Sequence, residues 1–116
     1  LSRVRELLRA NVLCAEDLSL TVDSVLAADL MSDVLTTGGP GMLLLTGLAS
    51  VQAVRTAAIA DLAGVVFIGG KKPGDEVVSL ARAERVPVMS TAMSMFEAAG
   101  LLYRAICVEQ ERNGTR

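Results

Sequence analysis

The sequence predicts an α/β fold: a single layered domain with a mostly parallel β-sheet flanked by helices. Three apolar segments with strand character, 42–46, 64–68 and 86–90, alternate with helical patterns through short loops. This alternation is typical of βαβ units, which build parallel sheets. The chain has 116 residues and a mass of 12.1 kDa, which gives room for one hydrophobic core. We therefore expect one domain over residues 1–109.

The first part of the chain carries weaker signals. Residues 2–9 place three apolar side chains on one helical stripe, so we expect a short amphipathic helix there. Asn11 is expected to end this helix, because Asn tolerates the left-handed conformation. Brief strands are expected at 12–14 and 21–27, the second with loose alternation of apolar and polar residues.

Helices are then expected between the strands of the second half. A short helical turn over 29–35 precedes the glycine-rich segment 37–41, where regular structure must stop. A helix over 50–62 begins at Ser50, a favourable N-cap residue. Another helix over 75–85 begins with two acidic residues, which favour the positive end of the helix dipole.

The last helix departs from simple amphipathic design. Ser94 and Glu97 have the spacing of a capping box, which fixes the start of the helix. A helix that is apolar on two faces is usually buried on two faces, so we expect one stripe to pack on the sheet and the other to meet a second copy of the chain. The alternative is a helix covered by the N-terminal segment. The expected interface residues are Met95, Phe96, Ala99, Leu102, Tyr103 and Ile106. Residues 110–116 contain no apolar side chain and are expected to be a disordered tail.

The composition narrows the class of function. The 11 basic and 13 acidic side chains give a net charge of −2, and aromatic residues make up 3% of the chain. Nucleic-acid binding normally needs a basic face and stacking aromatics, so it is disfavoured. No apolar run has the length of a membrane span, so no membrane association is expected. The two cysteines, Cys14 and Cys107, form no metal-binding motif, and a cytoplasmic location is expected.

A ligand site is predicted where the three best strands end. Small or polar residues follow each strand: Thr46 and Gly47, then Gly69, Gly70 and Lys71, then Ser90 and Thr91. The carboxyl ends of parallel strands share one edge of the sheet, where ligands bind. Ser50 adds a helix N-terminus to this edge. We expect an anion site that uses the amides of the glycine loop and the ammonium groups of Lys71 and Lys72. The alternative is that these residues form plain turns and caps.

Catalytic side chains are scarce. The chain has no histidine, the commonest general base and metal ligand. Asp29 and Asp33 would share a face if both lay on one helical turn, and could then hold Mg²⁺ or act as an acid–base pair. The alternative is that Asp29 caps the turn and Asp33 is solvated. We expect no catalytic residue, no resident metal and no cofactor, with a minimal Mg²⁺-dependent enzyme as the least favoured class.

The run from Ala28 to Tyr103 resembles a DRTGG domain. The stretches that carry the resemblance are 29–34, 44–47, 66–73, 87–91 and 94–97. The resemblance implies a sheet flanked by helices, related to the N-terminal domain of HPr kinase, that is often dimeric. Relatives occur beside phosphate acetyltransferase domains and between the CBS modules of regulated pyrophosphatases, which implies a sensory or assembly role.

One departure from the family pattern follows Gly47. Many members have Asp-Arg there, whereas this chain has Leu48 and Ala49 and so lacks those polar side chains. The expected function is a non-catalytic, homodimeric regulatory module that binds a small anionic metabolite or an adenine nucleotide. The alternative is a ligand-free interaction module that uses the apolar last helix.

Overall fold

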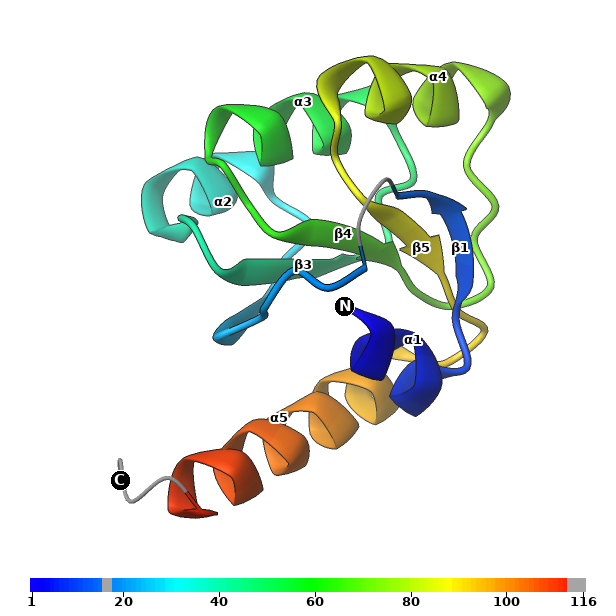
Figure 1. Ribbon diagram of the computed structural model, residues 1–116. Coiled ribbons are helices and arrows are strands. Elements are labelled where there is room, and N and C mark those ends of the chain that lie inside the picture. Colours follow the sequence, from blue (N-terminus) through cyan, green and yellow to red (C-terminus); the bar gives the residue numbers. More distant parts are fainter. Residues whose placement is uncertain (16–17, 113–116) are drawn as a thin grey trace.

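A five-stranded sheet forms the centre of the computed structural model, which describes residues 1–15 and 18–112 (Figure 1). The sheet order is β1-β5-β4-β3-β2. The strands are β1 (Asn11–Cys14), β2 (Ser24–Ala27), β3 (Met42–Thr46), β4 (Gly64–Phe67) and β5 (Val88–Ser90). The helices are α1 (Ser2–Leu8), α2 (Met31–Thr37), α3 (Val51–Ile59), α4 (Asp75–Glu84) and α5 (Met95–Arg112).

Four of the strands run parallel, which confirms the predicted mostly parallel sheet. The ladders β2–β3, β3–β4 and β4–β5 are all parallel, so each helix between them is a crossover. Strand β1 is the exception and pairs antiparallel with β5, with Asn11 opposite Ser90. The first strand of the chain therefore lies beside the last one, at one edge of the sheet.

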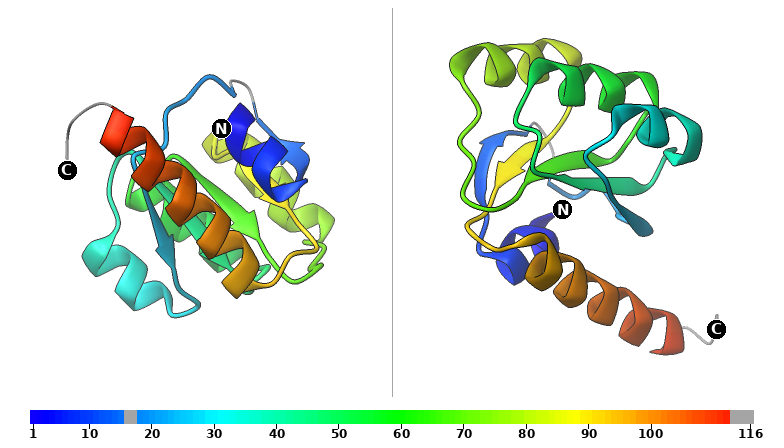
Figure 2. Two further views of the ribbon diagram at one scale, coloured as in Figure 1. Left: turned by 90° about the horizontal axis from the view of Figure 1, so that it is seen from below. Right: turned by 180° about the vertical axis from the view of Figure 1, so that it is seen from behind.

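Helices cover both faces of the sheet, and each face has its own core. Helices α2, α3 and α4 pack on one face, around a cluster that includes Leu44, Val65 and Phe67. Helices α1 and α5 lie side by side on the other face (Figure 2) around a cluster that includes Leu45 and Val66. Neighbouring residues in β3 and β4 thus point to opposite cores, as the period of a strand requires. Both faces are apolar because both are covered.

Two predicted helix starts are confirmed, and a side chain caps the helix at each of them. The Ser50 hydroxyl accepts a hydrogen bond from the Ala53 amide at 3.4 Å. At the start of α5, the Ser94 hydroxyl accepts from the Glu97 amide at 3.2 Å, and a Glu97 carboxylate oxygen accepts from the Ser94 amide at 3.3 Å. This reciprocal pair is the predicted capping box.

Several predicted element ends are wrong. Arg9, not Asn11, takes the left-handed conformation after α1 (φ 50°), because Asn11 already pairs with β5. The second strand begins at Ser24 instead of residue 21. Helix α3 ends at Ile59, since Asp61 has a positive φ of 58° and turns the chain back toward β4.

Helix α5 is longer than predicted. It continues through Arg112, so residues 110–112 of the expected disordered tail are helical, and residues 113–116 lie outside the described part of the chain. Figure 1 shows its C-terminal half extending past the sheet. None of the helices in the described ranges combines the length and the hydropathy that crossing a membrane needs.

Candidate functional site

The carboxyl ends of β2, β3, β4 and β5 meet at one edge of the sheet, as predicted. Backbone hydrogen bonds tie the strand ends in sequence: the Ala28 amide donates to Leu45 O (3.1 Å), Ile68 to Thr46 O (3.0 Å) and Thr91 to Phe67 O (2.9 Å). The structure therefore brings the predicted ligand residues of the three loops, together with Asp29 after β2, to the same edge.

Asp29 links the first two of these strand ends. Its Oδ1 atom accepts hydrogen bonds from the Thr46 hydroxyl (2.9 Å) and from the Gly47 amide (2.8 Å). The Thr46 hydroxyl in turn accepts from the Leu48 amide at 3.1 Å. Thr46 is fully buried, so these bonds satisfy a polar group that water cannot reach. One carboxylate oxygen thus fixes the turn after β3.

Asp29 and Asp33 do not share one helical face, so the condition for the Mg²⁺ or acid–base pair is not met. Helix α2 begins at Met31, so Asp29 lies before the helix and only Asp33 belongs to its first turn. Asp29 is held outside the helix because its carboxylate bonds to the neighbouring strand end. Within the described residues, no group of three or more His, Cys, Asp or Glu side chains gathers as a metal site would.

The glycine loop after β4 does not form the predicted anion-binding concavity. Gly69 and Gly70 have positive φ angles of 71° and 75°, which glycine adopts without strain. Their amides, however, donate to Met93 O (2.7 Å) and Thr91 O (2.9 Å). The glycines therefore bind the loop that follows β5, and they leave Lys71 and its neighbour Lys72 exposed as the cationic residues of this segment.

Thr91 connects the edge to the N-terminal helix. Its hydroxyl donates to Leu8 O at 2.7 Å in a buried bond and accepts from the Met93 amide at 3.2 Å. Beside it lies a cavity of about 270 Å³. Its lining residues are Leu8, Arg9, Thr91, Ala92, Met93 and Glu97. We call this space the Thr91 cavity.

The remaining predicted ligand residues do not line this cavity. Ser90 is the last residue of β5 and is 9% exposed, and Ser50 caps α3. Gly47 has room for a side chain, because a Cβ atom at this position would lie 3.7 Å from Asp29 Oδ1 and 3.8 Å from Ile68 Cδ1, at normal van der Waals distances. Arg9, which the sequence reasoning missed, is the cationic residue of the cavity. No sequence signal identifies it, because α1 and β5 lie far apart in the chain.

Helix α5 has an inner and an outer face, and only one can meet a partner. Leu102 is 3% exposed, and Met95 and Ala99 pack against the core beneath the sheet. The expected interface is therefore wrong for Leu102, which lies inside the protein. Phe96 and Tyr103, by contrast, are 89% and 72% exposed. Gly100 lies between them, and a Cβ atom at this position would have no neighbour within 4 Å in the part of the chain that the structure describes.

These features define a small α/β domain with a mostly parallel sheet, whose carboxyl edge is built from four strand ends. The chain belongs to the DRTGG domain family, whose model matches residues 3–105. Its fold is similar to a crystal structure of the CBS and DRTGG domains of the regulatory region of Clostridium perfringens pyrophosphatase, complexed with the activator diadenosine tetraphosphate. The TM-score is 0.69 and the sequence identity 16%, with 88% of this chain and 45% of that chain covered.

The chain thus spans less than half of the length of that pyrophosphatase fragment. At this level of identity the likeness concerns the fold. No curated protein sequence matches the chain.

Proposed function

We propose that this DRTGG domain is a non-catalytic regulatory module that binds a small anionic metabolite, of which an adenine nucleotide is the first candidate. The observation that carries the proposal is the Thr91 cavity at the carboxyl edge of the sheet. Ligands of open α/β sheets bind at this edge, outside the strand ends. The similar pyrophosphatase fragment is a regulatory region complexed with an adenine dinucleotide, which supports the same class of ligand.

The charges at the edge suit an anion. Arg9 lines the Thr91 cavity, and Lys71 lies on the loop whose backbone is bonded to Thr91 and Met93. Glu97 also lines the cavity, but one of its oxygens accepts from both the amide and the hydroxyl of Ser94. A volume of about 270 Å³ is near the lower limit of about 300 Å³ for sites that enclose a drug-sized ligand. The cavity therefore takes a small anion or one part of a nucleotide.

The hydroxyl groups at the edge are used for structure. Thr91 donates its proton to a backbone carbonyl, and Thr46 donates to Asp29, which itself holds the Gly47 amide. A nucleophilic hydroxyl needs a neighbouring base that is free to take its proton. The arrangement supports binding in preference to catalysis.

The test is thermal unfolding with AMP, ADP, ATP, diadenosine tetraphosphate and acetyl phosphate, each with and without Mg²⁺. A ligand at about 100 times its dissociation constant adds about 2.7 kcal/mol to the free energy of unfolding, which raises Tm by about 10 °C in a domain of this size. We expect a shift with at least one anion.

A pair of variants tests the position of the site. Arg9 and Arg85 are both exposed, both follow a helix and both have a left-handed backbone, with φ of 50° and 59°. Replacing either with glycine relieves the same backbone strain, but only Arg9→Gly removes a charge from the Thr91 cavity. The anion-induced shift should fall in Arg9→Gly and persist in Arg85→Gly. No shift with any compound, or equal shifts in the two variants, would contradict the site.

We further propose that the module is a homodimer joined through the outer face of α5. Phe96, Gly100 and Tyr103 follow one another at helical spacing, so the two exposed aromatic rings flank a glycine. Glycine lowers helix stability in an exposed position, and none of the described residues lies close enough to Gly100 to require a glycine there. Close packing of a second helix against Gly100 would explain the glycine at this position.

A two-fold antiparallel crossing at Gly100 is self-complementary. A residue that precedes Gly100 in one copy then faces a residue that follows Gly100 by a similar number of positions in the other copy. Phe96 of each copy meets Tyr103 of the other on one side, and Glu97 of each copy meets Arg104 of the other on the opposite side. Aromatic contact is thus flanked by opposite charges, which favours a second copy as the occupant of this face. If the protein is a monomer in solution, the same face fits the alternative, an interaction module for a different protein.

A further inference from the structure

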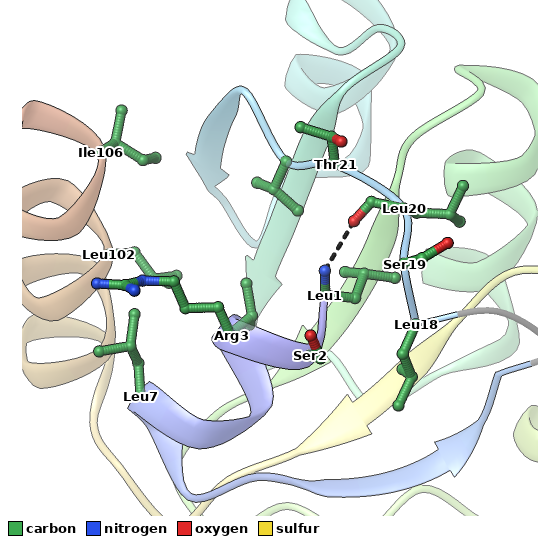
Figure 3. A pocket seen from close by; sticks show the side chains of 12 residues that line it. Leu1, Ser2, Arg3, Leu7, Leu18, Ser19, Leu20, Thr21, Leu102 and Ile106 are labelled. Atoms are coloured by element: carbon green, nitrogen blue, oxygen red, sulfur yellow. Dashed lines mark hydrogen bonds between the residues drawn. The ribbon is translucent and has the colours of Figure 1, made fainter. Parts of the chain in front are cut away.

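A second hollow lies on the face of the sheet that α1 and α5 cover. Its walls come from α1, from the segment 18–22 and from the later part of α5, and its volume is about 210 Å³. We call it the α1–α5 groove (Figure 3). It shares no lining residue with the Thr91 cavity. The groove is therefore a separate place on the molecule.

The floor of the α1–α5 groove is apolar and well packed. Leu1, Val4 and Leu102 line it and are only 7%, 5% and 3% exposed. Leu7 and Ile106 are half-buried at its sides, so each leaves apolar surface in contact with water. A ligand with an alkyl chain would remove that surface from water, which is the main driving force for binding in an apolar hollow.

One charged side chain stands in the wall of the groove. Arg3 is the only ionisable side chain among the lining residues, and it forms no ion pair with any residue in the ranges 1–15 and 18–112. Figure 3 shows its side chain extending from α1 toward α5. A guanidinium group matches a carboxylate with two parallel hydrogen bonds. The wall therefore offers a site for one anionic group above an apolar floor.

The size of the groove limits the ligand. Its 210 Å³ corresponds to about seven water molecules, at about 30 Å³ each in the liquid. A short alkyl chain fits this space, whereas only part of a nucleotide would. Among the described residues that line the groove, only Arg3 has an ionisable side chain, so they offer no side-chain partner for a second charged end on the ligand.

We propose that the α1–α5 groove binds a short aliphatic carboxylate, with the carboxylate on Arg3. The alkyl chain would contact Leu7 and Ile106, above the floor that Val4 and Leu102 form. The competing explanation is that the Arg3 methylene groups only cover the apolar floor while the charge remains in water. The two explanations differ in what they predict for a neutral alcohol and for a variant without the guanidinium.

The test is a titration of the ¹⁵N-labelled protein with sodium octanoate, followed by amide chemical shifts. We expect shifts at Leu7, Thr21 and Ile106, and none at Gly47 or Gly70, which belong to the carboxyl edge. Arg3→Gln should weaken octanoate binding about tenfold or more, since a charge-assisted hydrogen bond contributes that much affinity. 1-Octanol should bind the native protein with a similarly reduced affinity.

Two further variants make the result specific. Arg5→Gln is the matched control, because Arg5 is exposed on the same helix but does not line the groove. It should bind octanoate as the native protein does. Ile106→Trp should abolish binding by filling the groove from a half-buried position. Absence of octanoate-induced shifts at the groove, or equal affinity in Arg3→Gln and Arg5→Gln, would overturn the proposal.

Discussion

The carboxylate of Asp29 and the hydroxyl of Thr46 are joined by a hydrogen bond of 2.9 Å across the ends of two neighbouring strands. The same carboxylate oxygen accepts from the Gly47 amide. Asp29, two residues past the end of β2, therefore fixes the geometry of the turn after β3 and with it the shape of the carboxyl edge of the sheet.

This link predicts unequal effects for two aspartates. Asp29→Ala should lower the free energy of unfolding by about 1–2 kcal/mol, because it leaves the buried Thr46 hydroxyl and the Gly47 amide without their acceptor. Asp33→Ala, in the exposed first turn of α2, should change it by about 0.5 kcal/mol or less. Urea unfolding of the two variants measures both values. Equal losses would mean that the bond to Thr46 contributes little.

Thr91 should be a point of long-range stabilisation. Thr91→Val keeps the shape but leaves the Leu8 carbonyl and the Met93 amide unpaired in a buried place, at a cost of about 1–3 kcal/mol. Hydrogen exchange should also accelerate in α1, since the bond ties its last residue to the sheet. Thr36→Val is the control, because Thr36 is exposed and bonds only within its own helix. Unchanged exchange in α1 would contradict the proposed tie.

Gly47 offers a way to test the proposed ligand site at the carboxyl edge without disturbing the core. The closest atoms to a Cβ at this position are 3.7 Å away or more, so the branched side chain of Gly47→Val should cost little stability. If an anion bound in the Thr91 cavity extends along the edge to this loop, Gly47→Val should reduce the anion-induced rise in Tm, because the new side chain fills space beside Asp29 and Ile68. Gly39→Val is a control at another unobstructed glycine. An undiminished rise in Gly47→Val would remove this loop from the site.

A substitution at Gly100 should change the stability of the helix and the association of two copies in opposite directions. Gly100→Ala should raise the free energy of unfolding of the isolated chain by about 0.5–1 kcal/mol, since alanine is the better helix former and its methyl group meets nothing. If two copies cross at Gly100, the same methyl group should weaken the dimer. Sedimentation equilibrium at several concentrations reports the association. A variant with higher stability and unchanged association would place any interface elsewhere.

The exposed aromatic residues of α5 give a second test of the interface. Phe96→Glu and Tyr103→Glu should each shift the protein toward monomer, because the charge would be buried in an apolar contact. Ile59→Glu, at an apolar residue that is 75% exposed on α3, should leave the mass unchanged. Leu102→Glu is unsuitable for this purpose, since Leu102 is buried within the chain and its loss would unfold the protein. Light scattering distinguishes the outcomes.

The sequence predicts the parallel part of the fold well because each of its signals is local. Strand β3 has the predicted bounds Met42–Thr46, and the caps Ser50 and Ser94 form the expected hydrogen bonds. Capping depends on residues three positions apart, which a reader of the sequence can see. The same holds for the alternation of strands and helices.

The details of the site depended on contacts between distant segments. The amides of Gly69 and Gly70 look available in the sequence, but the loop after β5 supplies carbonyl acceptors for both. Asp29 looks like part of a helix, but the end of β3 holds it outside. Arg9 reaches the Thr91 cavity only because β1 pairs with β5. None of these partners is close in the chain, so periodicity and spacing could not reveal them.

The pairing of β1 with β5 also sets an order for folding during synthesis. Ribosomes deliver the N-terminus first, at about 5–20 residues per second, so β1 emerges several seconds before its partner strand exists. During that interval the middle of the domain can assemble in sequence, from β2 through α2, β3 and α3 to β4. Helix α1 and strand β1 cannot pack in their native positions until β5 and α5 have been synthesised. A nascent chain that stops before β5 would therefore expose the apolar face of the incomplete sheet. We expect chaperones to bind the chain during this interval.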